Sequence, residues 1–167
     1  LFKPSLRNSF YWHYHPEFEL VYVEATNGIR HVGQHISGFM ESDLVFIGSN
    51  IPHLNFDYGV KTTYRQIVVQ LKENLLGNAF EETPEFKNIE KLFKKASMGL
   101  CFSGKTKIIV AEKLRYMQQL NHLKQLFCLL EILEILARSK EVTTLNEQDT
   151  SVKLFLNDKI RMGSVYK

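Results

Sequence analysis

Hydrophobic and polar positions along the chain follow two different periods, and the change falls near residue 71. Before that point, short runs of β-branched and aromatic residues are separated by turn residues, a pattern typical of antiparallel sandwiches and barrels. After it, apolar residues recur at the spacing of amphipathic helices. The pattern therefore predicts a mainly β fold with carboxyl-terminal helices (α+β): an antiparallel β-barrel over residues 1–71, then a helical packing and dimerisation segment over residues 72–139.

The strands of the predicted barrel are bounded by turn signals. Asn27-Gly28 is the strongest of these, because both residues tolerate the positive φ angles of a tight hairpin turn. We therefore expect Phe18–Ala25 to pair with Ile29–Ile36 across this turn. Further turns are expected near Glu41-Ser42 and at Gly48 to Asn50, with strands at Asp43–Ile47, Ile51–Tyr58 and Thr62–Leu71 and a short strand or connector at Gly99–Ser103.

The helical segment is predicted to contain one helix beginning near Pro84 and two more between Lys105 and Ser139, divided near Asn121. The apolar arc of the last helix is too wide for a helix that faces water on its remaining sides. We expect this helix to pack under another helix of the chain and also to form part of a dimer interface, with the contacts made by Leu123, Phe127, Leu130 and Leu133.

Composition places the chain among folded, soluble proteins. Its 167 residues fit one domain, or one domain with a helical appendage, and 44% apolar and 23% charged residues are close to the globular average. No apolar run approaches the ~20 residues that span a bilayer, and no secretory signal is visible, so we expect a cytoplasmic protein. Cys101 and Cys128 lie in apolar surroundings and are interpreted as buried free thiols. A glycine-rich phosphate loop, a nucleophile elbow and an HExxH motif are all missing from the sequence.

The candidate chemistry is concentrated in the stretch WHYHPEFE at residues 12–19. Side chains alternate along a strand, so His13, His15 and Glu19 would share one face and could converge on one point. Two imidazoles and a carboxylate are good ligands for a divalent transition metal, and a fourth ligand would have to come from a neighbouring strand. Glu17 has the same parity, so spacing alone does not separate the two glutamates unless a bulge interrupts the strand.

Other interpretations of these residues stay open. On spacing alone, ordinary strand histidines that are hydrogen-bonded to neighbours or exposed to solvent are favoured. A pocket for a small organic ligand is a third interpretation, because imidazoles, carboxylates and Arg30 offer hydrogen-bond donors and acceptors. If the side of the strand that carries Arg30 is the interior, the charge of Arg30 needs a carboxylate or a bound anion as its partner.

The order of the motifs resembles that of the cupin fold. The pattern H-x-H-x3-E at His13, His15 and Glu19 and the later DLVFIGSNIPH, which ends at His53, are similar to the two cupin motifs. In metal-binding cupins the residue that matches His53 supplies the fourth ligand. Taken in order, HYHPEFELVYV, GIRHVG, DLVFIGSNIPH and ASMGLCFSG, followed by two helices, resemble the amino-terminal sensor half of AraC-type transcriptional regulators. The resemblance covers nearly the whole chain.

This resemblance implies a cupin-like barrel (double-stranded β-helix), a helical dimerisation segment and, over residues 140–167, a linker and the start of a truncated DNA-binding region. The implied function is the sensing of a small molecule, such as a carbohydrate, by a homodimer that reaches DNA only through helix-turn-helix units absent from this chain. We expect no enzyme activity, no cofactor and no membrane partner. The residues expected to bind the effector are His13, His15, Glu19, Arg30 and His53.

The alternative is a metal-dependent cupin enzyme of the dioxygenase or isomerase type. Its divalent transition metal would be bound by His13, His15, Glu19 and His53, with a water in an open position. Two departures from the cupin motifs weaken this alternative more than the sensor hypothesis: Ser42 stands where glycine is usual, and Gly28 lies further from the first motif than the general pattern prescribes. The choice between a metal and an organic effector depends on His53.

Overall fold

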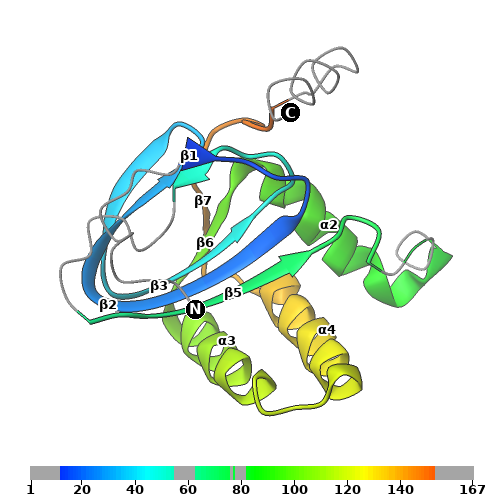
Figure 1. Ribbon diagram of the computed structural model, residues 1–167. Helices are drawn as coiled ribbons and strands as arrows, with labels where there is room; N and C mark the ends of the chain where they lie inside the picture. The colour runs from blue at the N-terminus through cyan, green and yellow to red at the C-terminus, as the bar shows by residue number, and fades with distance from the viewer. Residues whose placement is uncertain (1–11, 55–62, 76, 78–81, 153–167) are drawn as a thin grey trace, which may run out of the picture.

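The structure, a computed structural model, describes residues 12–54, 63–75, 77 and 82–152. Within them, seven strands form one antiparallel sheet, accompanied by three α-helices (Figure 1). The strands are β1 (Trp12–His13), β2 (Phe18–Val32), β3 (His35–Ile47), β4 (His53–Leu54), β5 (Arg65–Leu71), β6 (Leu100–Phe102) and β7 (Val142–Thr144). Their order is β1-β4-β2-β3-β6-β7, and β5 pairs with the first half of β2.

The two long strands β2 and β3 form the central hairpin. The turn predicted at Asn27-Gly28 is wrong, because the chain continues through these residues inside β2 and reverses only at Gly33, whose φ of 60° suits the turn. The pairing shifts between Glu24 and Asn27, which marks a β-bulge. The longer strand carries Val32 into the interior, where it is completely buried. The sequence Asn27-Gly28, which is typical of a hairpin turn, therefore lies next to a β-bulge in this chain.

The turn predicted near Glu41-Ser42 is also wrong. β3 passes through it, and Glu41, with a φ of 63°, stands between the paired positions on the far side of the bulge. The turn at Gly48 to Asn50 and the strand at Asp43–Ile47 are confirmed, the latter as the end of β3. Two predicted strands of the barrel remain. β5 covers most of the one predicted at Thr62–Leu71. In the one predicted at Ile51–Tyr58, β4 comprises only His53–Leu54, and residues 55–58 lie outside the described part of the chain.

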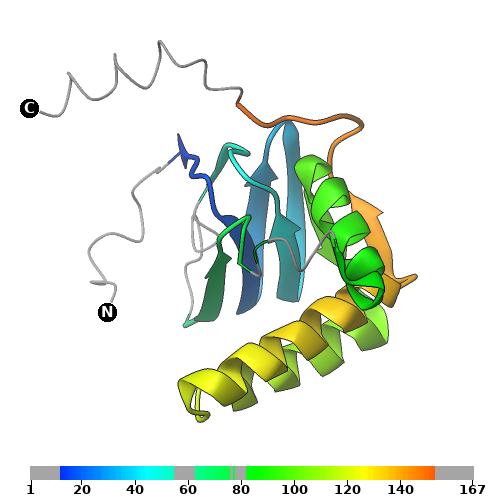
Figure 2. The same ribbon diagram turned by 90° about the vertical axis from the view of Figure 1, so that its right-hand side faces the viewer.

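The helices also follow the predicted division. They are α2 (Lys87–Lys95), preceded by the 3-10 turn η2 (Pro84–Phe86) and followed by η3 (Ala96–Met98), then α3 (Gly104–Met117) and α4 (His122–Arg138). The side chain of Asn121 caps α4 by accepting a hydrogen bond of 3.0 Å from the backbone N–H of Lys124. Figure 2 shows α3 and α4 side by side below the strands, with α2 beside the sheet.

The two faces of β2 belong to two different cores. Phe18, Leu20 and Tyr22 pack with Phe46 of β3 and with the helices, and this larger core includes Leu92, Leu114 and Leu133. The intervening residues point to the opposite face of the sheet. There, Val21 and Val23 form a second core with Val32, Val45, Ile47, Ile51 and Leu145. The period-two pattern of β2 therefore separates a helix-covered face from a face with no helix against it in the described chain.

The described strands form an open sheet, so the prediction of a closed barrel is corrected. β1 and β4 contain two residues each and β6 and β7 three each, which leaves too little paired edge to close a ring. β6 and β7 also extend the sheet to residues well beyond position 71. The coarser prediction, an antiparallel β fold followed by helices, is confirmed.

The polar stretch that follows α4 is not a free linker over its described length. β7 pairs with β6, and the next residues run back along the sheet and form backbone hydrogen bonds to Gly99, Met98, Ser97 and Asn50. We call residues 145–152 the strap. Among the described helices, none has the length and apolar character needed to cross a membrane.

The four residues predicted for the dimer interface occupy different environments on α4. Leu133 is completely buried in the core of the chain itself and is out of reach of a partner. Leu130 is half-buried, whereas Leu123 and Phe127 are exposed to 62% and 60%. The apolar arc of α4 is therefore divided between an internal face and an outward face.

This division predicts that the same substitution, leucine to alanine, will have very different effects on stability at two positions of α4. Leu133→Ala removes contacts from a filled core and should lower the free energy of unfolding by about 2–5 kcal/mol. Leu123→Ala, on the same helix, should change it by less than about 0.5 kcal/mol in the monomeric chain. Urea denaturation at a concentration low enough to exclude association measures both values, and equal losses would contradict this packing of α4.

Candidate functional site

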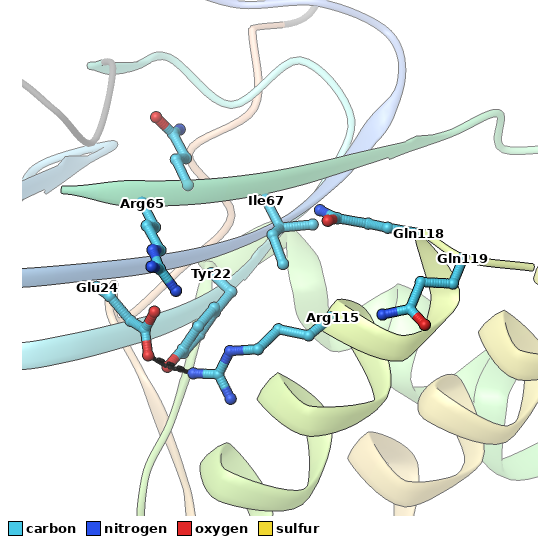
Figure 3. A pocket seen from close by; sticks show the side chains of 8 residues that line it. Tyr22, Glu24, Arg65, Ile67, Arg115, Gln118 and Gln119 are labelled. Atoms are coloured by element: carbon cyan, nitrogen blue, oxygen red, sulfur yellow. Dashed lines mark hydrogen bonds and ion pairs between the residues drawn. The ribbon is translucent and has the colours of Figure 1, made fainter.

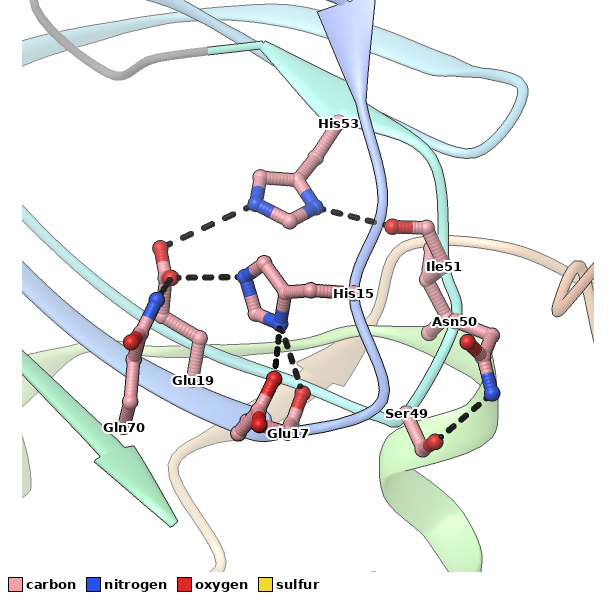
Figure 4. Close-up of polar contacts among 8 residues, drawn as sticks. All are labelled: His15, Glu17, Glu19, Ser49, Asn50, Ile51, His53 and Gln70. Atoms are coloured by element: carbon pink, nitrogen blue, oxygen red, sulfur yellow. Dashed lines mark hydrogen bonds and ion pairs between the residues drawn. The ribbon is translucent and has the colours of Figure 1, made fainter. Parts of the chain in front are cut away.

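Three histidines and a glutamate meet at the edge of the sheet face that lies opposite the helices. His13 belongs to β1 and His53 to β4, and the two are backbone partners in the pairing of these strands. His53 is also the backbone partner of Val32, which places β4 beside β2. One nitrogen from each of His13, His15 and His53 lies within 4.8 Å of the other two. Together with Glu19 of β2, these residues form what we call the His–Glu cluster. Figure 4 shows three of its members, His15, Glu19 and His53.

Of the two alternatives left open for residues 12–19, a continuous strand or an interrupted one, the structure shows the interrupted one, and the interruption separates the two glutamates. β1 ends at His13 and β2 begins at Phe18, so the segment around Pro16 is irregular. Glu19 is 6% exposed and points into the cluster. Glu17 is half-buried, and its backbone carbonyl accepts a hydrogen bond of 3.0 Å from Nδ1 of His15. The strand alternation that gave both glutamates the same parity does not hold across the proline.

The tautomer of His53 follows from its surroundings. Its Nδ1 lies 2.8 Å from the carbonyl oxygen of Ile51, and since a carbonyl only accepts, Nδ1 carries the hydrogen. Burial lowers the pKa of His53 to about 4, so the ring is neutral at pH 7 and its Nε2 bears a lone pair. This buried Nε2 has no hydrogen-bond partner among the described residues and lies 3.7 Å from Oε1 of Glu19. A lone pair therefore faces a carboxylate oxygen with no hydrogen between them.

His15 faces the same carboxylate from another side. Its Nδ1 donates to Glu17, and its Nε2 lies 3.0 Å from Oε2 of Glu19. This second contact is a hydrogen bond only if Nε2 is also protonated, so His15 is the imidazolium here. The hydrogen bond to Glu19 outweighs burial and raises the pKa of His15 above its ordinary value. In the absence of another cation, a proton on His15 balances the buried carboxylate.

Glu19 is the centre of the cluster. Burial alone would raise its pKa, but the hydrogen bonds from His15 and from Nε2 of Gln70, the latter 3.1 Å long, lower the pKa below its ordinary value. Gln70 lies directly across the strand pair from Glu19. The sequence analysis missed Gln70, because only the register between β2 and β5 identifies it.

The donor set fits a divalent transition metal. Three imidazoles and a carboxylate are typical ligands of such ions, and two of the imidazoles donate Nδ1–H to a backbone carbonyl, as metal-bound histidines do in most sites. Nε2 of His53 has no hydrogen-bond partner among the described residues, and a cation in front of it would satisfy its lone pair, as a hydrogen-bond donor would. The chain would supply fixed ligands to the ion, and the ion would supply Lewis acidity or a bound water.

Arg30, the fifth predicted ligand residue, is used differently. It lies on the same face of β2 but forms a buried ion pair with Asp43, with Nε and Oδ2 3.2 Å apart. Burial is the larger influence on Asp43 and raises its pKa despite the nearby arginine. Sγ of Cys101 lies 3.6 Å from Oδ1 of Asp43, and burial and that carboxylate raise the pKa of the thiol to about 11. The partner that Arg30 requires is thus a carboxylate of the chain, and Cys101 is a thiol at neutral pH.

A cleft lies where the sheet meets α3. This cleft of about 450 Å³ lies between β2, β5 and the end of α3, and Arg115 reaches across it to Glu24 and to the hydroxyl of Tyr22 (Figure 3). The guanidinium also stands 5.3 Å from the centre of the Tyr22 ring. These contacts hold α3 against the sheet, and the cleft is mostly polar and open to solvent. The cleft contains none of the predicted site residues.

The unequal environments of the two imidazoles predict unequal titrations. In an NMR titration of the metal-free chain, the ring of His53 should titrate near 4 and that of His15 above 6.5. The folded chain then binds fewer protons at His53 than the unfolded chain does between pH 6.5 and about 4, so the free energy of unfolding should fall as the pH is lowered through that window.

The contribution of His15 has the opposite sign. It is complete below pH 6.5 and is lost as the pH rises through the raised pKa of the folded state. In His53→Gln the loss of stability between pH 6.5 and 4 should become smaller. A His53 ring that titrates near 6.5 would contradict its burial in this cluster.

Comparison with known proteins gives no match for this chain: none among family models, none among curated proteins and none among solved structures. The geometry of the His–Glu cluster and of the elements around it therefore carries the functional argument.

Proposed function

We propose that the chain is the sensing domain of a regulatory protein and that its His–Glu cluster binds a divalent transition-metal ion. The observation that carries the proposal is the unpartnered Nε2 of His53, which is neutral and faces the carboxylate of Glu19 inside a group of three imidazoles. A buried carboxylate and a buried lone pair at 3.7 Å repel each other unless a cation or a hydrogen-bond donor lies between them. A metal ion would meet both, and it would displace the proton of His15.

The regulatory part of the proposal rests on how the chain is arranged. The motif order resembles that of the sensor half of AraC-type regulators, and an open sheet with the cluster on one face and a helix pair on the other suits a domain that binds a ligand and a second copy of itself. In such a regulator, DNA would be contacted by helix-turn-helix units in another part of the protein. A small organic effector, such as a sugar, would then bind beside the ion or in its place.

A metal-dependent enzyme is the second candidate, and one observation favours it. His13 and His15 are half-buried, whereas His53 and Glu19 are buried. A molecule from solvent would therefore reach an ion from the side of His13 and His15. The two hypotheses differ in what happens to the ligand. A sensor releases its ligand unchanged, whereas an enzyme releases a product, so mass spectrometry of compounds incubated with the metal-loaded chain separates them.

Metal binding by the full chain is the direct test. Isothermal titration with Zn²⁺ at pH 7.5 should show one ion per chain, and saturation at 100 times the dissociation constant should raise the free energy of unfolding by ~2.7 kcal/mol. His53→Ala and Glu19→Gln should each weaken binding at least about tenfold, because each removes a proposed ligand.

His35→Ala is the matched control. His35 is also a half-buried strand histidine, but its Nε2 is bonded to the hydroxyl of Ser37 and it is not part of the cluster. The control should bind Zn²⁺ as the unmodified chain does. Binding that is not stoichiometric, or that survives both cluster substitutions, would refute the metal proposal and leave an organic effector as the remaining ligand of a sensor.

Self-association through the outward face of α4 is part of the proposal. Leu123 and Phe127 are large apolar side chains exposed to 62% and 60% on one side of that helix. Phe127→Asp should raise the dimer dissociation constant by roughly 30-fold or more, since losing an aromatic anchor typically costs at least about 2 kcal/mol. Sedimentation equilibrium measures this change. Val68→Asp, at an exposed apolar position of β5, should leave it unaltered, and a strictly monomeric unmodified chain would contradict the dimer.

A further inference from the structure

We propose that the strap positions His53 and His15, so that docking of residues 145–152 and metal binding at the His–Glu cluster stabilise each other. The inference rests on the proposed function, because it concerns the same cluster. It adds two positioning residues, Asn146 and Val152, that lie far from the cluster in sequence and contact the backbone segments that carry its ligands.

The strap is docked along its length. Leu145 donates its backbone N–H to the carbonyl of Gly99 at 2.9 Å, and its side chain, 8% exposed, belongs to the core of the sheet face that also bears the cluster. Further along, the N–H of Thr150 donates to the carbonyl of Ser97 at 3.3 Å. These contacts fix the path of the strap from β7 toward the loop between β3 and β4.

Asn146 connects the strap to the strand beside His53. Its side chain is buried, and its Nδ2 donates to the carbonyls of Val32 and Met98 at 3.1 and 3.0 Å. Its Oδ1 accepts from the N–H of Gln34 at 2.9 Å. Val32 is the residue of β2 that pairs with His53. Asn146 therefore holds the end of β2 at the position where β4 is attached.

Val152 connects the strap to the loop before His53. Its N–H donates to the carbonyl of Asn50 at 2.8 Å, and the N–H of Asn50 donates to the carbonyl of His15, also at 2.8 Å. Asn50 has a φ of 57°, a conformation that asparagine tolerates better than most residues. The next residue, Ile51, accepts the hydrogen bond from Nδ1 of His53, as Figure 4 shows. The loop at Asn50 and Ile51 is therefore hydrogen-bonded to the strap, to the backbone of His15 and to the imidazole of His53.

These two connections predict a thermodynamic linkage. With the strap docked, the backbone that orients both imidazoles is held from outside, and with the strap released, Val32 and Asn50 each lose a partner. Metal ligands bind well only when their orientation is fixed, so the docked state should bind the ion more tightly. The same factor must then favour docking when the ion is bound, because linkage is reciprocal.

Asn146→Ala is the first test, with Co²⁺ as the probe because its visible absorption reports on its ligands. The variant should bind Co²⁺ about tenfold more weakly than the unmodified chain, as loss of an outer-shell contact typically does. The intensity of its absorption at saturation should change too, which a general loss of stability would not produce. Glu147→Ala, at the exposed neighbouring position, is the matched control and should behave as the unmodified chain does.

Val152→Pro is the second test and removes a single hydrogen bond. Proline lacks the N–H that donates to Asn50, whereas Val152→Ala keeps it. The proline variant should bind Co²⁺ more weakly than the alanine variant. In the reverse direction, Co²⁺ should slow hydrogen exchange of the Thr150 and Val152 amides in the unmodified chain. The factor of slowing should equal the factor by which docking of Val152 increases the affinity for Co²⁺.

The outcomes separate this inference from the function it rests on. An unmodified chain that binds no Co²⁺ would overturn the metal site of the proposed function, and the linkage with it. If the chain binds Co²⁺, but Asn146→Ala and Val152→Pro bind it with unchanged affinity and absorption and strap exchange does not respond, the linkage is overturned and the metal site stands. If Asn146→Ala fails to fold, the pair of substitutions at Val152 decides.

Discussion

The alternation of side chains along β2 is the constraint on which both faces of the sheet depend. Leu20 points to the core shared with the helices, while its neighbours Glu19 and Val21 point to the opposite face. Because β2 pairs with β3 along one side and with β5 and β4 along the other, a slip of one residue would bury the wrong set against the helices and turn Glu19 away from the histidines. The register of β2 with β3 on each side of the bulge therefore determines the packing and the position of the cluster together.

Two groups of buried charged residues lie on the face of the sheet opposite the helices, and they differ in the ligand atoms that they bring together. Arg30 and Asp43 neutralise each other at 3.2 Å, so the charge inside the sheet is balanced without any added group. In the His–Glu cluster, one protonated imidazole, His15, meets the carboxylate of Glu19, and the second, His53, is kept neutral by burial and is left without a hydrogen-bond partner at Nε2. A desolvated, unpaired atom is costly, but Nε of Arg30 and Oδ2 of Asp43 lack a hydrogen-bond partner among the described residues just as Nε2 of His53 does. What sets the cluster apart is the group of three imidazole nitrogens within 4.8 Å of one another, and this is why we interpret it as the ligand site.

Strand parity put His13, His15 and Glu19 on one face but on its own favoured ordinary strand histidines, and only the resemblance to the second cupin motif added His53. The structure brings Glu19 and the three imidazoles together. Parity failed at the interruption after β1, so it did not distinguish Glu17 from Glu19. The signal at Asn27-Gly28 was misread because a bulge and a turn use the same residue types. The strap was predicted as a linker because its docking depends on backbone atoms and on one asparagine, whose partners are distant in sequence and leave no periodic pattern.

The position of the cluster determines which other parts of the chain a bound ion would affect. The helices pack on the opposite face of β2, so between the cluster and the exposed residues of α4 lie the sheet and the core on its far side. Close-packed interiors of this kind resist small displacements. The strap, by contrast, is bonded through the backbone of Asn50 to the same loop that orients His53, and through Asn146 to the strand beside it. The hydrogen bonds that lead away from the cluster therefore run to the strap and not to the helix layer, which packs on the other face of β2.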